Sequence, residues 1–231
     1  MNILRIKSLY AGYGASTVLH GIDLVVDEGE SVAVVGRNGA GKSTLLLSVF
    51  QEANIQSGEI WVHDRRIDGM PGYFAPKLGI SISPQGRRIL PNLTVKENLL
   101  LSKATGRKGA WDLRAVFDLF PVLEQRASSS GVNLSGGQQQ MLAIGRALMA
   151  NPTLLFLDEP SEGLSPVLID GLVEALNAIR KVGTGILVVE QHLNLVKRTT
   201  DRFVILSKGQ TVGSGPTFTI SEPQNQLLMA V

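Results

Sequence analysis

The sequence predicts an α/β fold with parallel β-strands. Apolar runs of strand length alternate with helical patterns after residue 142, β-branched segments fill the first third, and 44% of the residues are hydrophobic against 18% charged. Alternating strands and helices are typical of a parallel sheet covered by helices, and the composition is ordinary for a globular protein. We therefore expect residues 1–231 to form a single domain.

The first third of the chain has the pattern of β-structure. Residues 3–35 contain "VLHGIDLVV" and "SVAVVG", which are rich in β-branched residues and are separated by the turn signal "DEGE". A second β unit, "GEIWVHDRRIDG", covers residues 58–69. These segments predict a β layer together with one buried strand.

The middle of the chain is helical. Residues 92–126 place apolar side chains three and four positions apart, and Ser135 is a good N-cap for a helix that ends at Asn151, before Pro152. The packing side of that helix is formed by Met141, Leu142, Ile144, Ala147 and Leu148. The pattern predicts a helical lobe.

Strands and helices alternate in the last third. "LLFL" and "GILVVEQH" are short apolar runs typical of buried parallel strands, and residues 168–182 between them form a helical pattern that Gly183 stops. "RFVILSKGQTVGSG" predicts a hairpin that turns at Lys208 and Gly209.

The net charge decides nothing about function, whereas the absence of cysteine excludes several kinds of site. The net charge of +2 gives no argument for a nucleic-acid partner, and the absence of cysteine excludes disulfides, thiolate metal sites and cysteine nucleophiles. The sequence has no apolar run near the roughly 18–20 residues that cross a bilayer. We expect a cytosolic protein.

"GRNGAGKST" is a phosphate-binding motif placed between the apolar strand "SVAVV" and the helix "TLLLSVF". Its glycines allow backbone amides to surround phosphate oxygens, Lys42 reaches the β- and γ-phosphates, and the Ser43 hydroxyl binds Mg²⁺. The motif predicts a P-loop NTPase (RecA-like) core and leaves kinase, GTPase and ATPase open. Its nucleotide-binding residues are Gly36, Arg37, Asn38, Gly39, Ala40, Gly41, Lys42, Ser43 and Thr44.

Two acidic residues follow the buried strand in "LLFLDEP". They lie at the carboxyl end of the strand, where ligands collect in open α/β sheets. We expect Asp158 to anchor Mg²⁺ and Glu159 to polarise the water that attacks the γ-phosphate.

The pair Gly136 and Gly137 follows the Ser135 N-cap. Glycines at the exposed start of a helix let a bulky anion approach its unpaired amides. Since one γ-phosphate does not need two cradles from one compact chain, we expect the second cradle to serve a nucleotide held by another subunit.

"LSGGQQQ" resembles the signature of ABC-type ATP-binding subunits, and the phosphate loop, the signature and "LLFLDE" occur in that family's order. The resemblance implies the ABC ATPase fold, in which residues 1–85 and 152–231 form a catalytic lobe with an antiparallel β subdomain and residues 86–151 form an inserted helical subdomain. It also implies a head-to-tail dimer, homomeric or heteromeric, with each ATP between one Lys42 loop and the partner's Ser135, Gly136, Gly137 and Gln138.

Three further roles come from the same resemblance. Gln85 matches the glutamine that contacts Mg²⁺ and supports catalysis, His192 matches the switch histidine at the γ-phosphate, and Tyr13 matches the aromatic that stacks on adenine. Arg87 and Arg88 are interpreted as a solvated loop. Ser165 departs from the family pattern, since many members carry aspartate there.

"PQGRRILPNLTVKENL" followed by "SEGLSP" is similar to the short ATPases of importers for branched-chain amino acids and, in related systems, urea or short amides. The resemblance implies ATP hydrolysis at the cytoplasmic face of the membrane, with integral-membrane permease subunits as partners and an external solute-binding protein as an indirect one. Glutamine at position 85 leaves the solute open. An ABC ATPase acting on nucleic acid or ribosomes is the competing class.

Overall fold

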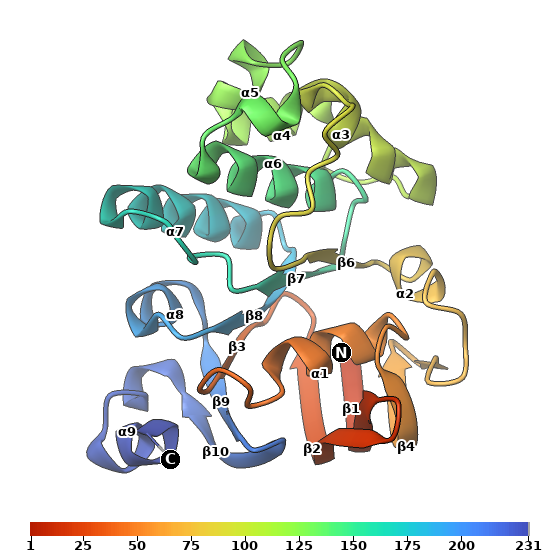
Figure 1. Cartoon of the computed structure of the whole chain (residues 1–231), viewed down its shortest axis with the longest axis vertical. Coiled ribbons are helices and arrows are strands. Elements are labelled where there is room, and N and C mark those ends of the chain that lie inside the picture. Colours follow the sequence, from red (N-terminus) through yellow and green to blue (C-terminus); the bar gives the residue numbers. More distant parts are fainter. Residues whose placement is uncertain (231) are drawn as a thin grey trace.

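Residues 1–230 are described by a computed structural model, in which two β-sheets lie below a helical lobe (Figure 1). The first sheet has the strand order β2-β1-β4-β5. It is antiparallel throughout and consists of β1 (Asn2–Tyr13), β2 (Ser16–Asp27), β4 (Asn54–Val62) and β5 (Arg65–Arg66).

The second sheet has the order β10-β9-β3-β8-β7-β6 and is parallel except for the β9–β10 hairpin. Its strands are β3 (Ser31–Val35), β6 (Ile80–Ser83), β7 (Leu154–Asp158), β8 (Gly185–Glu190), β9 (Arg202–Ser207) and β10 (Gln210–Pro216). Val35 pairs with Glu190, and Asp158 pairs with Val189. The carboxyl ends of β3, β7 and β8 therefore meet at one edge.

The parallel sheet separates two hydrophobic cores. Alternate residues of β3 divide between them, because successive side chains of a strand point to opposite faces. Val32 and Val34 pack toward α1 and the antiparallel sheet, whereas Ala33 and Val35 pack toward the helices α6, α7 and α8. The buried strand among the N-terminal β segments is thus confirmed.

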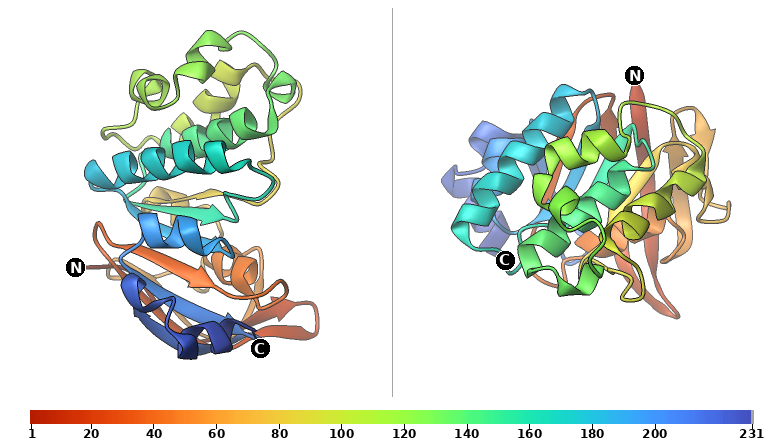
Figure 2. Two further views of the ribbon diagram at one scale, coloured as in Figure 1. Left: turned by 90° about the vertical axis from the view of Figure 1, so that its left-hand side faces the viewer. Right: turned by 90° about the horizontal axis from the view of Figure 1, so that it is seen from above.

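Helices cover both faces of the parallel sheet (Figure 2). Outside residues 86–151 the helices are α1 (Lys42–Val49), α2 (Phe74–Lys77), α7 (Pro166–Lys181), α8 (Leu193–Thr199), the 3-10 turn at Thr217–Thr219 and α9 (Pro223–Ala230). Since α1 begins directly after the loop that leaves β3, the amino end of this helix reaches the same edge of the sheet.

The helical lobe consists of short helices stacked on α6 (Figure 1). These are α3 (Val95–Leu100), α4 (Leu113–Leu119), α5 (Pro121–Gln125) and α6 (Gly136–Leu148), with 3-10 turns at Leu101–Thr105 and Gly131–Asn133. The helical pattern of residues 92–126 is interrupted because Gly106 takes a left-handed conformation and Pro121 begins a new helix.

The other predictions made from the sequence agree with the structure in part. The hairpin turns at Lys208 and Gly209, where both residues have positive φ, and Ser135 caps α6, as expected. The helix after Asp158 begins two residues early, at Pro166. Sequence reasoning missed β6 and the C-terminal α9, although Pro223 at the first turn is an ordinary helix-start signal.

Within residues 1–230, every helix is too short or too polar to cross a membrane.

Candidate functional site

A groove opens at the edge of the parallel sheet where β3, β7 and β8 end. Its walls are Val18, Asn38, Gly39, Gly41, Lys42, Ser43, Thr44, Gln85 and Glu159. These residues come from β2, from the loop after β3, from the amino end of α1 and from the loops that follow β6 and β7. The groove therefore brings the two chemical motifs of the sequence together.

The loop between β3 and α1 needs glycine at two places for different reasons. Gly36 has φ 157°, and a Cβ there would lie 2.2 Å from the Leu206 carbonyl oxygen. The backbones at Gly36 and Leu206 therefore lie too close together for a side chain at position 36. Gly41 has φ 102° and serves as the N-cap of α1. The Lys42 ammonium donates to the carbonyls of Gly36 (2.9 Å) and Arg37 (3.1 Å), which holds it against the loop.

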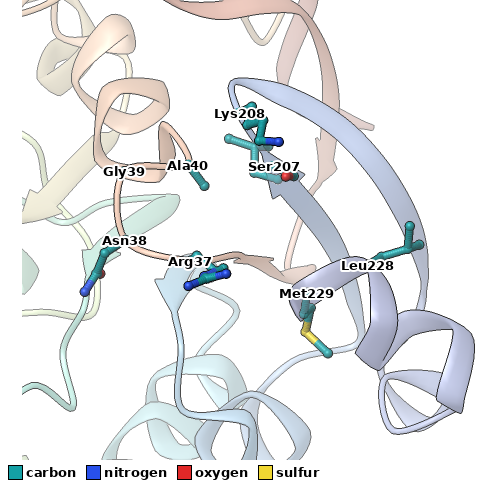
Figure 3. Close-up of a pocket in the computed structure, with 9 residues that line it drawn as sticks. Arg37, Asn38, Gly39, Ala40, Ser207, Lys208, Leu228 and Met229 are labelled. Atoms are coloured by element: carbon teal, nitrogen blue, oxygen red, sulfur yellow. The ribbon is translucent and has the colours of Figure 1, made fainter. Parts of the chain in front are cut away.

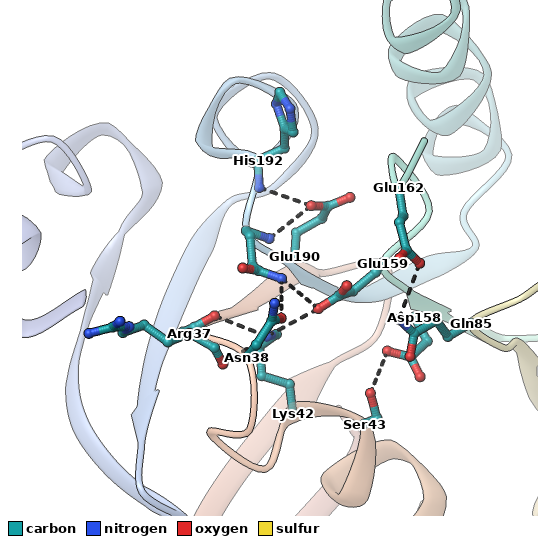
Figure 4. A network of polar contacts seen from close by, with 12 residues as sticks. Arg37, Asn38, Lys42, Ser43, Gln85, Asp158, Glu159, Glu162, Glu190 and His192 are labelled. Carbon is teal, nitrogen blue, oxygen red and sulfur yellow. Dashed lines mark hydrogen bonds and ion pairs between the residues drawn. The ribbon is translucent and has the colours of Figure 1, made fainter. Parts of the chain in front are cut away.

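Lys42 also contacts the acidic end of β7. Its Nζ lies 3.2 Å from Glu159 Oε1, and the two side chains are 4% and 13% exposed. The Gln191 amide donates to the same carboxylate oxygen over 2.9 Å and to Asn38 Oδ1 over 2.6 Å (Figure 4). Glu159 itself has φ 47°, a left-handed conformation that is uncommon outside glycine.

Asp158 is the buried member of the acidic pair. The Ser43 hydroxyl donates to its Oδ1 over 2.9 Å, and the Gln85 backbone amide also donates to its carboxylate. Burial raises the pKa of Asp158, and the neighbouring Glu159 charge adds to the increase, while the hydrogen bonds and Lys42 oppose it. Ser43, Gln85 and Asp158 line one cleft, so oxygen groups suited to a hard cation share it. The Gln85 side-chain amide donates to Glu162.

Glu190 was not anticipated from the sequence, where it is one polar residue at a strand end. Its side chain is buried, and its carboxylate accepts hydrogen bonds from the backbone amides of Ser161 (2.9 Å), Gln191 (2.8 Å) and His192 (2.9 Å). Backbone donors of this kind offset the cost of burying a charge. Glu190 thus ties the loop after Glu159 to the loop after β8.

Of the two residues that follow Glu190, Gln191 is the one whose side chain contacts the groove residues Asn38 and Glu159. The backbone amide of His192 is held by Glu190, and its imidazole points away from Lys42 and Glu159, at the start of α8 (Figure 4). Gln191, and not His192, therefore lies beside Glu159 and Asn38, and the contact of His192 with a γ-phosphate stays a prediction. The physical reason is that consecutive side chains leaving a strand point in opposite directions.

Tyr13 lies at the end of β1 and pairs with Ser16 in the β1–β2 hairpin. The residue is 47% exposed. An exposed ring of this kind is available for stacking, and its adenine contact stays a prediction.

The predicted second cradle lies in the helical lobe, at the amino end of α6. Ser135 and Gln138 form a reciprocal capping box. The backbone amide of Gln138 donates to Ser135 Oγ (3.4 Å), and the backbone amide of Ser135 donates to Gln138 Oε1 (3.0 Å). Gly136 is exposed. Gly137 is buried, which corrects the expectation that both glycines are exposed: a Cβ there would lie 2.7 Å from Leu168 Cδ1 of α7.

The interpretation of Arg87 and Arg88 as a solvated loop agrees with the exposed side chain of Arg88 but does not hold for the backbone. Both have positive φ, 64° and 44°, and their carbonyl oxygens accept hydrogen bonds of 2.9 and 2.8 Å from the guanidinium of Arg146 on α6. Arg87 in turn donates to Gln140 Oε1. The spacing of these residues in the sequence gives no signal of the contact, because 58 positions separate Arg146 from Arg88.

A second hollow lies on the outer side of the phosphate loop (Figure 3). Residues 37–40 form one wall, the end of β9 forms another, and Leu228 and Met229 of α9 close it. The C-terminal helix therefore packs beside the phosphate loop.

The fold and the groove define a P-loop nucleotide-binding protein with an additional helical lobe. The ABC transporter family model matches residues 19–162, and the chain belongs to that family. It is an ATP hydrolase with the ABC ATPase fold.

Two relatives and one solved structure illustrate the similarity. The chain is 39% identical over 202 residues to the high-affinity branched-chain amino acid transport ATP-binding protein BraG of Pseudomonas aeruginosa, across 87% of each chain. It is 35% identical over 216 residues to the probable branched-chain amino acid transport ATP-binding protein LivF of Archaeoglobus fulgidus, across 92% of each. The dimeric, post-hydrolysis structure of the ATP-binding cassette MJ0796 with ADP and Pi superposes with a TM-score of 0.82 at 25% identity, covering 93% of this chain and 98% of that one.

Proposed function

We propose that this chain is the ATP-binding and hydrolysing subunit of a membrane importer for branched-chain amino acids. ATP binding and hydrolysis are supported by one observation: Lys42, Ser43, Asp158 and Glu159 lie together at one edge of the parallel sheet. The names of the two relatives, at 39% and 35% identity over most of the chain, support the solute class.

ATP binds to the loop of residues 36–44 in this proposal. Backbone amides of the loop and the amino end of α1 surround the phosphates, and Lys42 supplies the positive charge at the β- and γ-phosphates. Glu159 accepts a hydrogen bond from the attacking water. Phosphoryl transfer needs mainly positioning and charge stabilisation, which these groups provide without a covalent intermediate.

The side chains of Ser43, Gln85 and Asp158 are suited to binding a Mg²⁺ ion. Ser43 Oγ and Asp158 Oδ1 are 2.9 Å apart, and Gln85 lines the same cleft. Hydroxyl, carboxylate and amide oxygens are the ligands that magnesium prefers. When bound, the ion neutralises charge on the phosphate oxygens. Asp158 and Ser43 would hold the Mg²⁺ ion, and Gln85 connects this cleft to the start of the helical lobe.

The second anion-binding turn, Ser135–Gln138, serves the nucleotide of a partner ATPase subunit. In Figure 1 α6, which the turn begins, lies above β7 in the helical lobe, whereas α1, which follows the phosphate loop, lies below β7. The dimeric MJ0796 cassette supports an assembly of two cassettes. A second copy of this chain or a sister ATPase occupies the partner position.

The pathway for the solute belongs to integral-membrane permease subunits, which the helical lobe contacts from the cytoplasmic face. An external solute-binding protein acts on the complex indirectly, and nucleic acid is not a partner. Closure of two ATPase subunits on ATP and their reopening after hydrolysis drive the permease.

Reconstitution with the permease and the solute-binding protein in proteoliposomes tests the proposal. Radiolabelled leucine and valine are expected to accumulate in an ATP-dependent manner, and a matched reaction with the non-hydrolysable nucleotide is the control. ATP-dependent uptake of urea instead of leucine or valine would assign the chain to the urea and short-amide importers. A complex that binds nucleic acid with strong salt sensitivity and lacks permease subunits would overturn the transport role.

A further inference from the structure

We propose that the hollow between the phosphate loop and α9 binds a short aliphatic carboxylate, and that this ligand weakens the binding of ATP. The residues that line the hollow indicate the class of ligand. The choice of a branched-chain carboxylate rests on the proposed function, because the imported solute is itself a carboxylate of this kind.

The charge of the lining favours an anionic ligand. The hollow is lined by Arg37, Asn38, Gly39, Ala40, Leu206, Ser207, Lys208, Leu228 and Met229. Two of these residues are cations, both exposed, and none is an anion. A hollow lined by charges of one sign attracts ligands of the opposite sign.

The apolar walls and the size of the hollow favour a small aliphatic ligand. Leu228 and Met229 of α9 are half-buried and form the wall across from the phosphate loop (Figure 3). The volume of the hollow is about 230 Å³. This lies below the roughly 300–1,000 Å³ of sites for drug-sized ligands. A short branched chain that carries a carboxylate combines the required charge, apolar surface and size.

Hydrogen bonds hold the frame of the hollow. The Gly209 backbone amide donates to the Ala40 carbonyl over 3.0 Å, which joins the phosphate loop to the turn that carries Lys208. At the base of α9, the buried Asn225 side chain donates to the Thr219 carbonyl over 2.9 Å. The walls are therefore in place before a ligand binds, as is usual for small-molecule sites.

Arg37 connects the hollow to the nucleotide groove. Its side chain lines the hollow and points away from Lys42 and Glu159, whereas its backbone carbonyl accepts a hydrogen bond from Lys42 Nζ over 3.1 Å (Figure 4). A phosphate at Lys42 competes with this carbonyl and with Glu159. A carboxylate that holds Arg37 against Lys208 and α9 favours the nucleotide-free arrangement of the loop. Since coupling between two sites is reciprocal, ATP weakens carboxylate binding by the same factor.

Three probes test the proposal by isothermal titration calorimetry on the full chain. Leucine and its oxo acid, α-ketoisocaproate, carry the branched chain with a carboxylate, whereas isoamylamine carries the chain without one. Binding is expected for the carboxylates and not for the amine. Saturating carboxylate is expected to raise the Kd of ATP by about 5-fold or more, the usual size of coupling between sites. The tighter of the two carboxylates identifies the ligand as the solute itself or its oxo acid.

Variants of Lys208 separate the hollow from the nucleotide groove. Lys208→Gln is expected to weaken carboxylate binding by about two- to fivefold, the size of one exposed ion pair, and Lys208→Arg is expected to preserve it. Both keep the wild-type Kd of ATP and melting temperature in the absence of carboxylate. Lys197→Gln, an exposed lysine of α8, is the matched control. Lys42→Ala is expected to bind carboxylate as wild type does, because Lys42 lies outside the hollow.

Four results would each overturn the proposal: no binding of either carboxylate, equal binding of isoamylamine, an unchanged Kd of ATP with carboxylate bound, or loss of carboxylate binding in Lys42→Ala. Equal carboxylate binding by wild type and Lys208→Gln would overturn it as well. Failure of the proposed function is a separate result, in which the reconstituted complex takes up neither leucine nor valine. Carboxylate binding and its effect on ATP are measured without the permease, so the two failures are distinguishable.

Discussion

The Lys42 ammonium and the Glu159 carboxylate form an ion pair of 3.2 Å in which both side chains are largely shielded from water. Because the two residues come from different motifs, this contact connects the phosphate loop to the end of β7. The other two hydrogen bonds of the ammonium go to loop carbonyls, so its three donors are occupied. A phosphate group at Lys42 therefore has to displace either the Glu159 carboxylate or a loop carbonyl.

Lys42→Ala is expected to abolish ATP binding and ATP-dependent dimerisation. The substitution removes the positive charge from the cradle and leaves Glu159 without its ion-pair partner. Equilibrium binding and light scattering with and without ATP measure both effects, and Lys208→Ala, an exposed lysine, is the control. Normal dimerisation of Lys42→Ala with ATP would contradict the assignment of the cradle.

Glu159→Gln is expected to bind ATP and to lower turnover by about 10²- to 10⁴-fold, the range for loss of a positioned acid or base. Because the Ser43 and Lys42 groups remain, the variant accumulates as a nucleotide-bound dimer. Size-exclusion chromatography with ATP detects that species, with Glu174→Gln on the exposed face of α7 as control. A monomer with unchanged turnover would remove Glu159 from the mechanism.

Asp158→Asn is expected to stabilise the nucleotide-free protein at neutral pH while it abolishes Mg²⁺-dependent hydrolysis. Burial raises the pKa of Asp158 above its ordinary value of 3.8, so the ionised carboxylate lowers stability at every pH above its pKa in the folded state. Protonation relieves that penalty as the pH falls through the folded pKa, and the advantage of Asn then disappears. Urea unfolding of both proteins between neutral and acidic pH measures the difference.

Asp64→Asn, at an exposed turn between β4 and β5, is expected to show no such pH-dependent difference. Greater instability of Asp158→Asn at neutral pH would mean that the contacts with Ser43 and Lys42 outweigh the cost of burial.

The two glycines at the start of α6 are expected to respond differently to alanine. At Gly137 the new Cβ would lie 2.7 Å from Leu168 Cδ1, and overpacking of this kind typically costs about 1–3 kcal/mol. At Gly136 the nearest atom is the flexible end of Arg87, at 3.1 Å, so folding is preserved. Urea unfolding of each variant, and of Gly137→Ala combined with Leu168→Ala, measures the effect. Equal stability of the two single variants would exclude close packing as the reason for Gly137.

Arg146→Met is expected to destabilise the protein and to loosen the loop after Gln85. The guanidinium donates to the carbonyls of Arg87 and Arg88, and a hydrogen bond to a charged group is worth about 1.5–3 kcal/mol. Arg146→Lys is expected to rescue poorly, because an ammonium lacks the planar fork that reaches both carbonyls. Hydrogen exchange of the loop amides and denaturant unfolding report the two effects. Full rescue by lysine would show that charge alone suffices.

Much of the candidate site could be predicted from the sequence because its parts are local. The loop Gly36–Thr44 and the acidic pair Asp158–Glu159 each follow an apolar strand directly, and parallel strands bring their carboxyl ends to one edge. The Ser135 cap and the turn at Lys208–Gly209 depend on neighbours within a few positions, and both agree with the structure. Short-range backbone preferences therefore determined these features.

Tertiary packing decided the rest. The sequence pattern alone does not tell whether Gln191 or His192 contacts the groove residues. The choice depends on where β8 ends and on the three backbone amides that donate to Glu190. The burial of Gly137 depends on Leu168, and the conformation of the loop after Gln85 depends on Arg146. Glu190 is 29 positions from Ser161, Leu168 is on a different helix from Gly137, and Arg146 is 59 positions from Arg87, so only the folded chain brings these groups together.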